Sequence, residues 1–138
     1  MANRFFRQFR KQLEAEVVDI FARVSFGSSG APTLDATNSK GIVSVTRSSA
    51  GRYVVVFGTN AGLLDTYNRL LCVKHVFDES GNGGTAPASP AMYVFANSIN
   101  VLGTSSITVQ FNAAGVATDP ASGEVVLIDF VLKNSTAP

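Results

Sequence analysis

The chain has 138 residues, of which 46% are hydrophobic and 15% charged, with one cysteine and a formal net charge of +1. This length suits one domain with its own core, and a single cysteine excludes an intrachain disulfide. No apolar run approaches the roughly 20 residues of a membrane-spanning helix, and no apolar segment follows the basic start as in a secretory signal. The charge is uneven, because the first eleven residues carry +4 and the other 127 hold 7 basic and 10 acidic groups.

Residues 1–14 are predicted to form a basic amphipathic arm with the only good helix pattern in the chain. Asn3 can cap its first turn, and Phe6, Phe9 and Leu13 recur at helical spacing. A mitochondrial transit peptide or a membrane-surface helix has a similar pattern, but the short length and the following acids favour docking on protein. A helix this short needs a surface to pack on. The residues expected to contact a partner are Arg4, Phe5, Phe6, Arg7, Phe9 and Arg10.

Residues 15–138 are predicted to fold as one all-β domain, an antiparallel β-sandwich or jelly roll. Its nucleus is the hairpin at 41–58, where Gly51 can supply the positive φ of the loop. The apolar second strand of this hairpin is expected inside a sheet covered on both sides. The remaining strands are predicted at 16–26, 69–77, 91–99, 105–111 and 124–133.

Strict alternation predicts which side chains share a face in these strands. Asp129 falls on the outward face of the last strand and is expected to meet water or a partner's donor, because burying a carboxylate is costly. The last strand itself could lie at a sheet edge or between subunits. The expected sets are Val43 with Val45 opposite Ile42, Ser44 and Thr46; Tyr53, Val55 and Phe57 opposite Val54 and Val56; Leu71, Val73, His75 and Phe77 opposite Leu70, Cys72, Lys74 and Val76; Ile107, Val109 and Phe111; and Val126, Ile128, Phe130 and Leu132.

No catalytic, cofactor or metal site is expected. His75 lies on an apolar strand face without a neighbouring nucleophile, which favours a structural or interfacial role. Cys72 points the opposite way and is expected to be buried and inert. The loop at 78–90 is expected to be mobile or projecting, and it has neither the spacing of a calcium loop nor the lysine of a phosphate-binding loop. Four basic residues beside an acidic body are a weak signal for nucleic-acid binding.

Three stretches together resemble small virion proteins of tailed bacteriophages. They are SKGIVSVTRSSAGRYVVVF at 39–57, DTYNRLL at 65–71 and TDPASGEVVLIDFVLKNS at 118–135, and the RFFRQF arm fits as well. The chain is most similar to the capsid cementing (decoration) proteins of Bordetella-type podophages. The resemblance implies a jelly roll on the outer surface of an icosahedral capsid. There it would bridge subunits of the major capsid protein and associate with itself as a homodimer or a trimer, without catalytic residues or cofactors.

Two alternatives to the cementing function stay open. A tail or fibre-base component of a virion would form a trimer or larger ring and would not bind empty capsids. A ligand-binding β-sandwich, such as a receptor- or glycan-binding module, would have a concave polar pocket that the loop at 78–90 could line. An enzyme is not expected, nor is a nucleic acid or a membrane as the direct partner.

Overall fold

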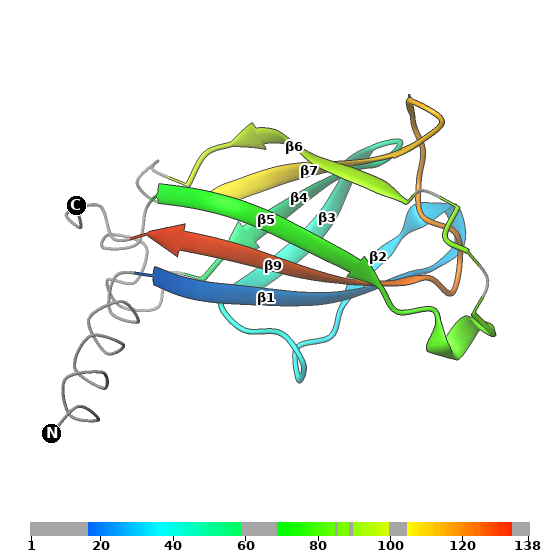
Figure 1. Cartoon of the computed structure of the whole chain (residues 1–138), viewed down its shortest axis with the longest axis horizontal. Coiled ribbons are helices and arrows are strands. Elements are labelled where there is room, and N and C mark those ends of the chain that lie inside the picture. The colour runs from blue at the N-terminus through cyan, green and yellow to red at the C-terminus, as the bar shows by residue number, and fades with distance from the viewer. Residues whose placement is uncertain (1–16, 59–68, 85, 89, 100–104, 134–138) are drawn as a thin grey trace, which may run out of the picture.

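The computed structural model describes residues 17–58, 69–84, 86–88, 90–99 and 105–133, so the predicted arm at 1–14 lies outside the described residues. Two antiparallel sheets pack face to face (Figure 1), which confirms the all-β sandwich. Within these ranges there is no α-helix, only the short 3-10 turns η1 (Ser28–Gly30) and η2 (Ser80–Asn82).

Each sheet contains four strands that pair one after the other, and sheet B has one more short strand paired at its side. Sheet A has the order β2-β1-β9-β5, and sheet B has the order β3-β4-β7-β6 with β8 paired to β7. The strands of sheet A are β2 (Pro32–Leu34), β1 (Val17–Phe26), β9 (Val125–Lys133) and β5 (Arg69–Phe77). Those of sheet B are β3 (Ile42–Ser49), β4 (Arg52–Phe57), β7 (Ser106–Ala113), β6 (Ala91–Asn97) and β8 (Val116–Ala117).

The core lies between the sheets and is filled by alternate side chains of the long strands. Phe26, Tyr53 and Phe111 meet edge to face, with ring centroids 5.2–5.8 Å apart, and they close one end of the sandwich. Each large apolar side chain buried in this way contributes about 1.5–3 kcal/mol. The predicted inward sets of β4, β7 and β9 are confirmed: Tyr53, Val55, Phe57, Ile107, Val109, Phe111, Val126, Ile128, Phe130 and Leu132 are all buried.

The predicted hairpin is confirmed, with β3 and β4 joined by a turn in which Gly51 has φ +69°. β4 lies between β3 and β7, as expected for an interior strand. On its outer face Val54 and Val56 are half-buried, so the side chains of the described residues cover this face less completely than the core face.

The predicted faces of two strands are partly wrong, because each strand contains a β-bulge. In β3 the register shifts after Ile42, so Ile42 packs against the core while Val43 is 64% exposed. In β5 a similar shift leaves Leu71 exposed and packs Leu70 against the core. A bulge adds one residue to one strand of a pair, and strict alternation then predicts the wrong face on one side of it.

β9 is not an edge strand, so the alternative that placed it at a sheet edge or between subunits is wrong. β1 pairs with one of its edges along nine residues, and β5 pairs with the other. Its backbone donors and acceptors are therefore used inside sheet A, and self-association through that edge is excluded in the folded chain. Only the outer face of β9 remains available to a partner.

Candidate functional site

A polar cluster joins the turn of the β3–β4 hairpin to the loop that precedes β9. The Asp119 carboxylate accepts hydrogen bonds from Nε and Nη2 of Arg47 at 2.9 and 2.7 Å and from the backbone N–H of Gly51 at 2.8 Å. The hydroxyl oxygen of Tyr53 lies 2.9 Å from Asp119 Oδ1 and 2.9 Å from the carbonyl oxygen of Gly30. The carboxylate thus ties its own loop to the hairpin, and the Tyr53 hydroxyl adds the segment of Gly30. We call these five residues the Asp119 cluster.

The charges of the Asp119 cluster indicate a structural role. The Arg47 guanidinium, together with the Gly51 N–H and the Tyr53 hydroxyl, lowers the pKa of Asp119 from its ordinary value of 3.8 to about 2. Burial and the neighbouring carboxylate raise the pKa of the Tyr53 phenol. At neutral pH the acid is therefore ionised and the phenol neutral, and each is held by fixed partners.

The Asp119 cluster also explains the pattern on which the family resemblance rests. Arg47 ends SVTR, Gly51 and Tyr53 belong to GRY, and Asp119 belongs to TDP. Although these motifs lie far apart in the sequence, their polar residues meet at one point of the fold. In the fold these residues form a hydrogen-bonded junction between the hairpin and the loop before β9.

The depressed pKa of Asp119 predicts a loss of stability in acid. Its ionised form is preferred in the folded chain, so its contribution is complete above about pH 4 and is lost as the pH falls through about 2. We expect the free energy of unfolding of the wild type to fall over this interval more steeply than that of Asp119→Asn. Urea denaturation at a series of pH values measures the difference. Parallel curves for the two proteins would contradict the assigned ion pair.

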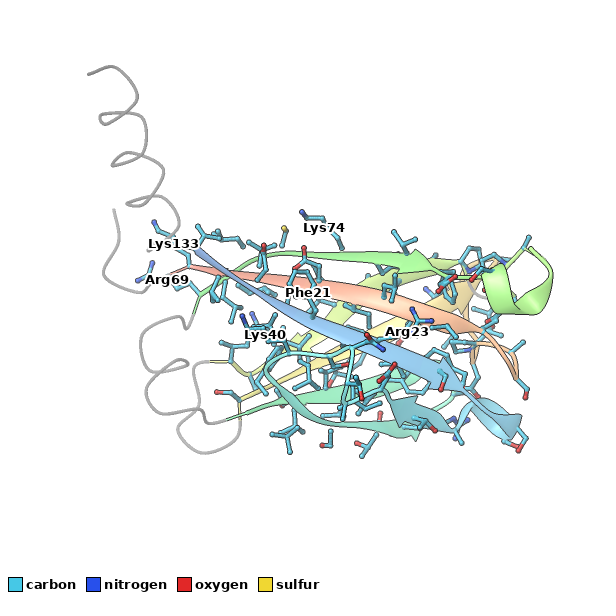
Figure 2. All side chains as sticks on the ribbon, turned by 90° about the horizontal axis from the view of Figure 1, so that it is seen from below. Phe21, Arg23, Lys40, Arg69, Lys74 and Lys133 are labelled. Atoms are coloured by element: carbon cyan, nitrogen blue, oxygen red, sulfur yellow. The ribbon has the colours of Figure 1, made fainter. Side chains whose placement is uncertain are left out.

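The outer face of sheet A presents side chains of three neighbouring strands, and we call it the sheet A face. Side chains of β1, β9 and β5 stand side by side in cross-strand rows, which follow from the register of the two pairings. Figure 2 shows this face edge-on, with Lys74 pointing away from the sandwich and Lys133 and Arg69 at one end. In the order β1, β9, β5 the rows are Val17–Lys133–Arg69, Asp19–Val131–Cys72, Phe21–Asp129–Lys74 and Arg23–Leu127–Val76.

The middle of the sheet A face contains an apolar hollow of about 500 Å³. Phe21, Leu127 and Val76 border it, with exposed fractions of 44%, 38% and 63%. Lys74 and Asp129 add one charge of each sign. Neighbouring exposed apolar side chains that are rimmed by polar groups are typical of interaction sites on folded domains. The hollow is therefore the candidate docking point of this face.

Asp129 stands at the edge of this hollow with one oxygen unsatisfied. Its Oδ2 lies 3.8 Å from Nζ of Lys74, whereas Oδ1 is buried and has no hydrogen-bond partner among the described residues. Burial, and next the negative charge of Asp19, raise the pKa of the Asp129 carboxyl. The prediction that Asp129 lies on the outward face of its strand is confirmed. Its Oδ1 can still accept a hydrogen bond from water or from a partner.

This environment predicts a stabilising substitution. Because the pKa of Asp129 is raised in the folded chain, ionising this group opposes folding as the pH rises above its ordinary value of 3.8. In the protein without residues 1–14, Asp129→Asn is therefore expected to unfold at a higher temperature than its parent at pH 7, by a few degrees, and at the same temperature near pH 3. Scanning calorimetry at both pH values is the measurement. A variant that is less stable at pH 7 would show that the ionised carboxylate stabilises the fold.

The two residues considered for nucleophilic or metal chemistry point away from each other. His75 lies between the sheets, packs edge to face against Phe77 and Phe111, and has Nε2 3.0 Å from the carbonyl oxygen of Pro90. These are the contacts of a packing residue that ties β5 to the start of β6. Cys72 is exposed, so the prediction that it is buried is wrong, because β5 turns this side chain outward at the rim of sheet A. In the described ranges no three His, Cys, Asp or Glu side chains are grouped as metal ligands would be.

Glu124 is a buried polar residue whose role the sequence did not indicate. It is 2% exposed, and its carboxylate accepts hydrogen bonds from the backbone N–H groups of Ala88 at 2.6 Å and Ala121 at 2.7 Å. These bonds fasten the loop at 78–90 to the turn before β9. The only sequence signal is an acid directly before a long apolar strand, which does not reveal its distant partner.

A smaller aromatic surface lies on the outer face of sheet B. Arg52 stacks on the ring of Phe95 at 3.8 Å from the ring centroid and donates from Nε to Oε1 of Gln110 at 2.6 Å. Tyr93 and Phe95 are 44% and 47% exposed. Here the Arg52 guanidinium covers the ring of Phe95 and is already hydrogen-bonded to Gln110. The polar and aromatic groups of this face therefore have more partners within the chain than those of the sheet A face.

The six arm residues expected to contact a partner lie outside the described residues, so the structure does not place them. No helix among the described residues is long and apolar enough to span a membrane. Comparison with protein-family models, with curated proteins and with solved structures finds no match to this chain.

Proposed function

We propose that this protein is a structural virion protein that cements the outer surface of an icosahedral phage capsid by bridging subunits of the major capsid protein. The observation that carries the proposal is the convergence of the resembling motifs in the Asp119 cluster. The residues that define the family pattern, Arg47, Tyr53 and Asp119 among them, hold the sandwich closed. Motifs whose residues fix the fold, and do not surround a reactive group, suit a protein with a mechanical role.

The sheet A face suits such a bridging role. It offers an apolar hollow beside charges of both signs on a sheet whose strand β9 is paired along both edges. A stable protein contact buries about 1,600 Å² in total, and many copies on one shell add their contacts multivalently. A rigid body with two usable outer faces can therefore strengthen the junctions between capsid subunits without any chemical step.

The proposal includes jelly-roll connectivity, self-association and the arm as part of the clamp. The pairing of the first long strand, β1, with the last, β9, in the middle of one sheet supports jelly-roll connectivity. A homodimer on capsid twofold axes is the expected assembly, with a trimer as the second possibility. Because the edges of β9 are filled, self-association has to use an outer face, another strand or the arm.

Electron cryomicroscopy of the native particle that contains this chain tests the proposal. We expect density for a two-sheet sandwich on the outside of the shell, lying across the seams between capsid subunits. Density in the tail or at the fibre base would replace the proposal by the first alternative. A soluble protein that never copurifies with particles and retains a small ligand would replace it by the second.

Removal of residues 1–14 is predicted to weaken shell binding and leave the β body folded. The described core begins at β1, so the truncated protein should keep the circular dichroism of a β body and unfold in one cooperative transition. Cosedimentation with shells stripped of this protein measures the binding. Undiminished binding of the truncated protein would remove the arm from the clamp.

A further inference from the structure

We propose that in the free protein the arm folds back over the sheet A face of its own chain. Its apolar side chains would lie over the hollow, and the acidic segment Glu14–Glu16 over the row that contains Lys133 and Arg69. The arm then forms a third layer on the sandwich. This inference rests on the described face and on the sequence of the arm, and it holds or fails independently of any binding to a capsid.

The length and direction of the chain fit this placement. β1 begins at Val17, in the row at one end of the sheet A face, and runs along the face to Arg23. These positions span about 20 Å of strand. As a helix, residues 3–13 are about 16 Å long, which matches the face. The three residues that join the helix to Val17 can extend about 10 Å, enough to raise the chain from the sheet and reverse it.

The order of charges along the arm matches the order of charges on the face. Next to Val17, the face is basic at Lys133 and Arg69, and the chain segment that must lie there contains two glutamates. Beyond this row the face becomes acidic at Asp19 and Asp129. In the reversed arm the corresponding stretch contains Arg10. Opposite charges therefore meet in two successive places.

The apolar stripe of the arm also matches the hollow, and its Arg10 matches the unsatisfied carboxylate of Asp129. The stripe formed by Phe6, Phe9 and Leu13 has the size and character to cover the exposed side chains around the hollow. On the helix, Arg10 follows Phe6 by one turn and flanks this stripe, so its guanidinium can donate to the buried Oδ1 of Asp129. The other basic side chains of the arm stay on the outer side, where a second protein can reach them.

The single cysteine allows a direct test on the full chain. Cys72 is exposed in the row next to Asp129, so a nitroxide attached to it broadens the amide NMR signals of any segment on the sheet A face. We expect the signals of residues 4–13 to be broadened to the same extent at every protein concentration. Broadening seen only when a nitroxide-bearing chain is mixed with an isotopically labelled one would assign the face to the arm of a second copy and overturn the proposal. Unbroadened arm signals would overturn it as well.

A pair of matched variants separates docking from general effects on the fold. Phe21, at the hollow, and Tyr93, on the opposite outer face, are both 44% exposed. Phe21→Glu is expected to abolish the broadening and the hydrogen-exchange protection of the arm, whereas Tyr93→Glu should leave both unchanged. Core amide signals report folding in each variant. Equal loss of arm protection in the two variants, or in neither, would contradict docking at the hollow.

Discussion

Replacing Gly51 by alanine is expected to destabilise the protein by more than about 3 kcal/mol or to prevent folding. Gly51 has φ +69°, and a Cβ at this position would lie 2.6 Å from the carbonyl oxygen of Phe111 and 2.7 Å from the backbone nitrogen of Thr118. These are backbone atoms of β7 and of the residue that follows β8, and they cannot rotate away as a side chain could. The residue also donates its N–H to Asp119 and accepts a hydrogen bond from the N–H of Phe111 at 2.7 Å, so it is held on both sides.

Gly83→Ala is the matched control for this substitution. Gly83 also has φ +69°, but a Cβ there would meet no atom within 4 Å. It therefore measures the cost of the left-handed backbone alone, which is about 1–2 kcal/mol for alanine. Urea denaturation of both variants gives the difference that is due to close packing at Gly51. Equal losses in the two variants would show that backbone conformation, and not the contact with sheet B, requires glycine at this turn.

The strand pattern could be predicted from the sequence because alternation is a local property. The inward residues of β4, β7 and β9 follow from period two alone, and the structure buries all of them; in β7 it also buries Gln110 of the opposite face. The predictions failed where a second strand decides the outcome. Nothing local distinguishes Val43 or Leu71 from their neighbours as the residue that a bulge turns outward. Likewise, β9 lies inside sheet A because β1 and β5 pair with it, and the sequence of β9 alone does not show which strands are its neighbours.

The candidate surfaces were harder to predict because their residues come from distant parts of the chain. Arg47 and Asp119 are 72 residues apart, and their pairing follows only from the closed sandwich. The rows of the sheet A face combine three strands, so neither the hollow nor the free oxygen of Asp129 has a local signal. What the sequence did indicate is that Asp129 faces outward on an otherwise apolar strand. A single charge in such a position is the best sequence clue to a surface that lacks a partner.

The Asp119 cluster and the sheet A face are connected through β9. The cluster fixes the hairpin against the loop before β9, and β9 in turn is the middle strand of the sheet A face. Loosening the cluster should therefore disturb the sheet A face at a distance, through the position of β9. A mutation in the Asp119 cluster can therefore change binding at the sheet A face indirectly. Stability has to be measured together with binding to distinguish this indirect effect from a direct one.

Asp119→Ala is expected to lower the free energy of unfolding by about 3 kcal/mol, because it removes several charge-assisted hydrogen bonds at once. The Gly51 N–H and the Arg47 guanidinium would lose their acceptor, while the Tyr53 hydroxyl keeps the carbonyl of Gly30. Asp35→Ala is a suitable control, since Asp35 accepts hydrogen bonds only within its own exposed turn and has Arg23 as a distant ion partner at 3.7 Å. Its effect should be a small fraction of that of Asp119→Ala.

A double-mutant cycle with Arg47→Ala identifies which partner matters most. If the ion pair provides most of the stabilisation, Arg47→Ala alone should approach the effect of Asp119→Ala, and the double variant should be little worse than either. The bonds to Gly51 and Tyr53 argue for a different result, because they remain when Arg47 is removed and they hold the turn and the core directly. We therefore expect Asp119→Ala to be clearly the more damaging single change, with partial coupling to Arg47. Equal single effects with complete coupling would make the cluster an ion pair and nothing more.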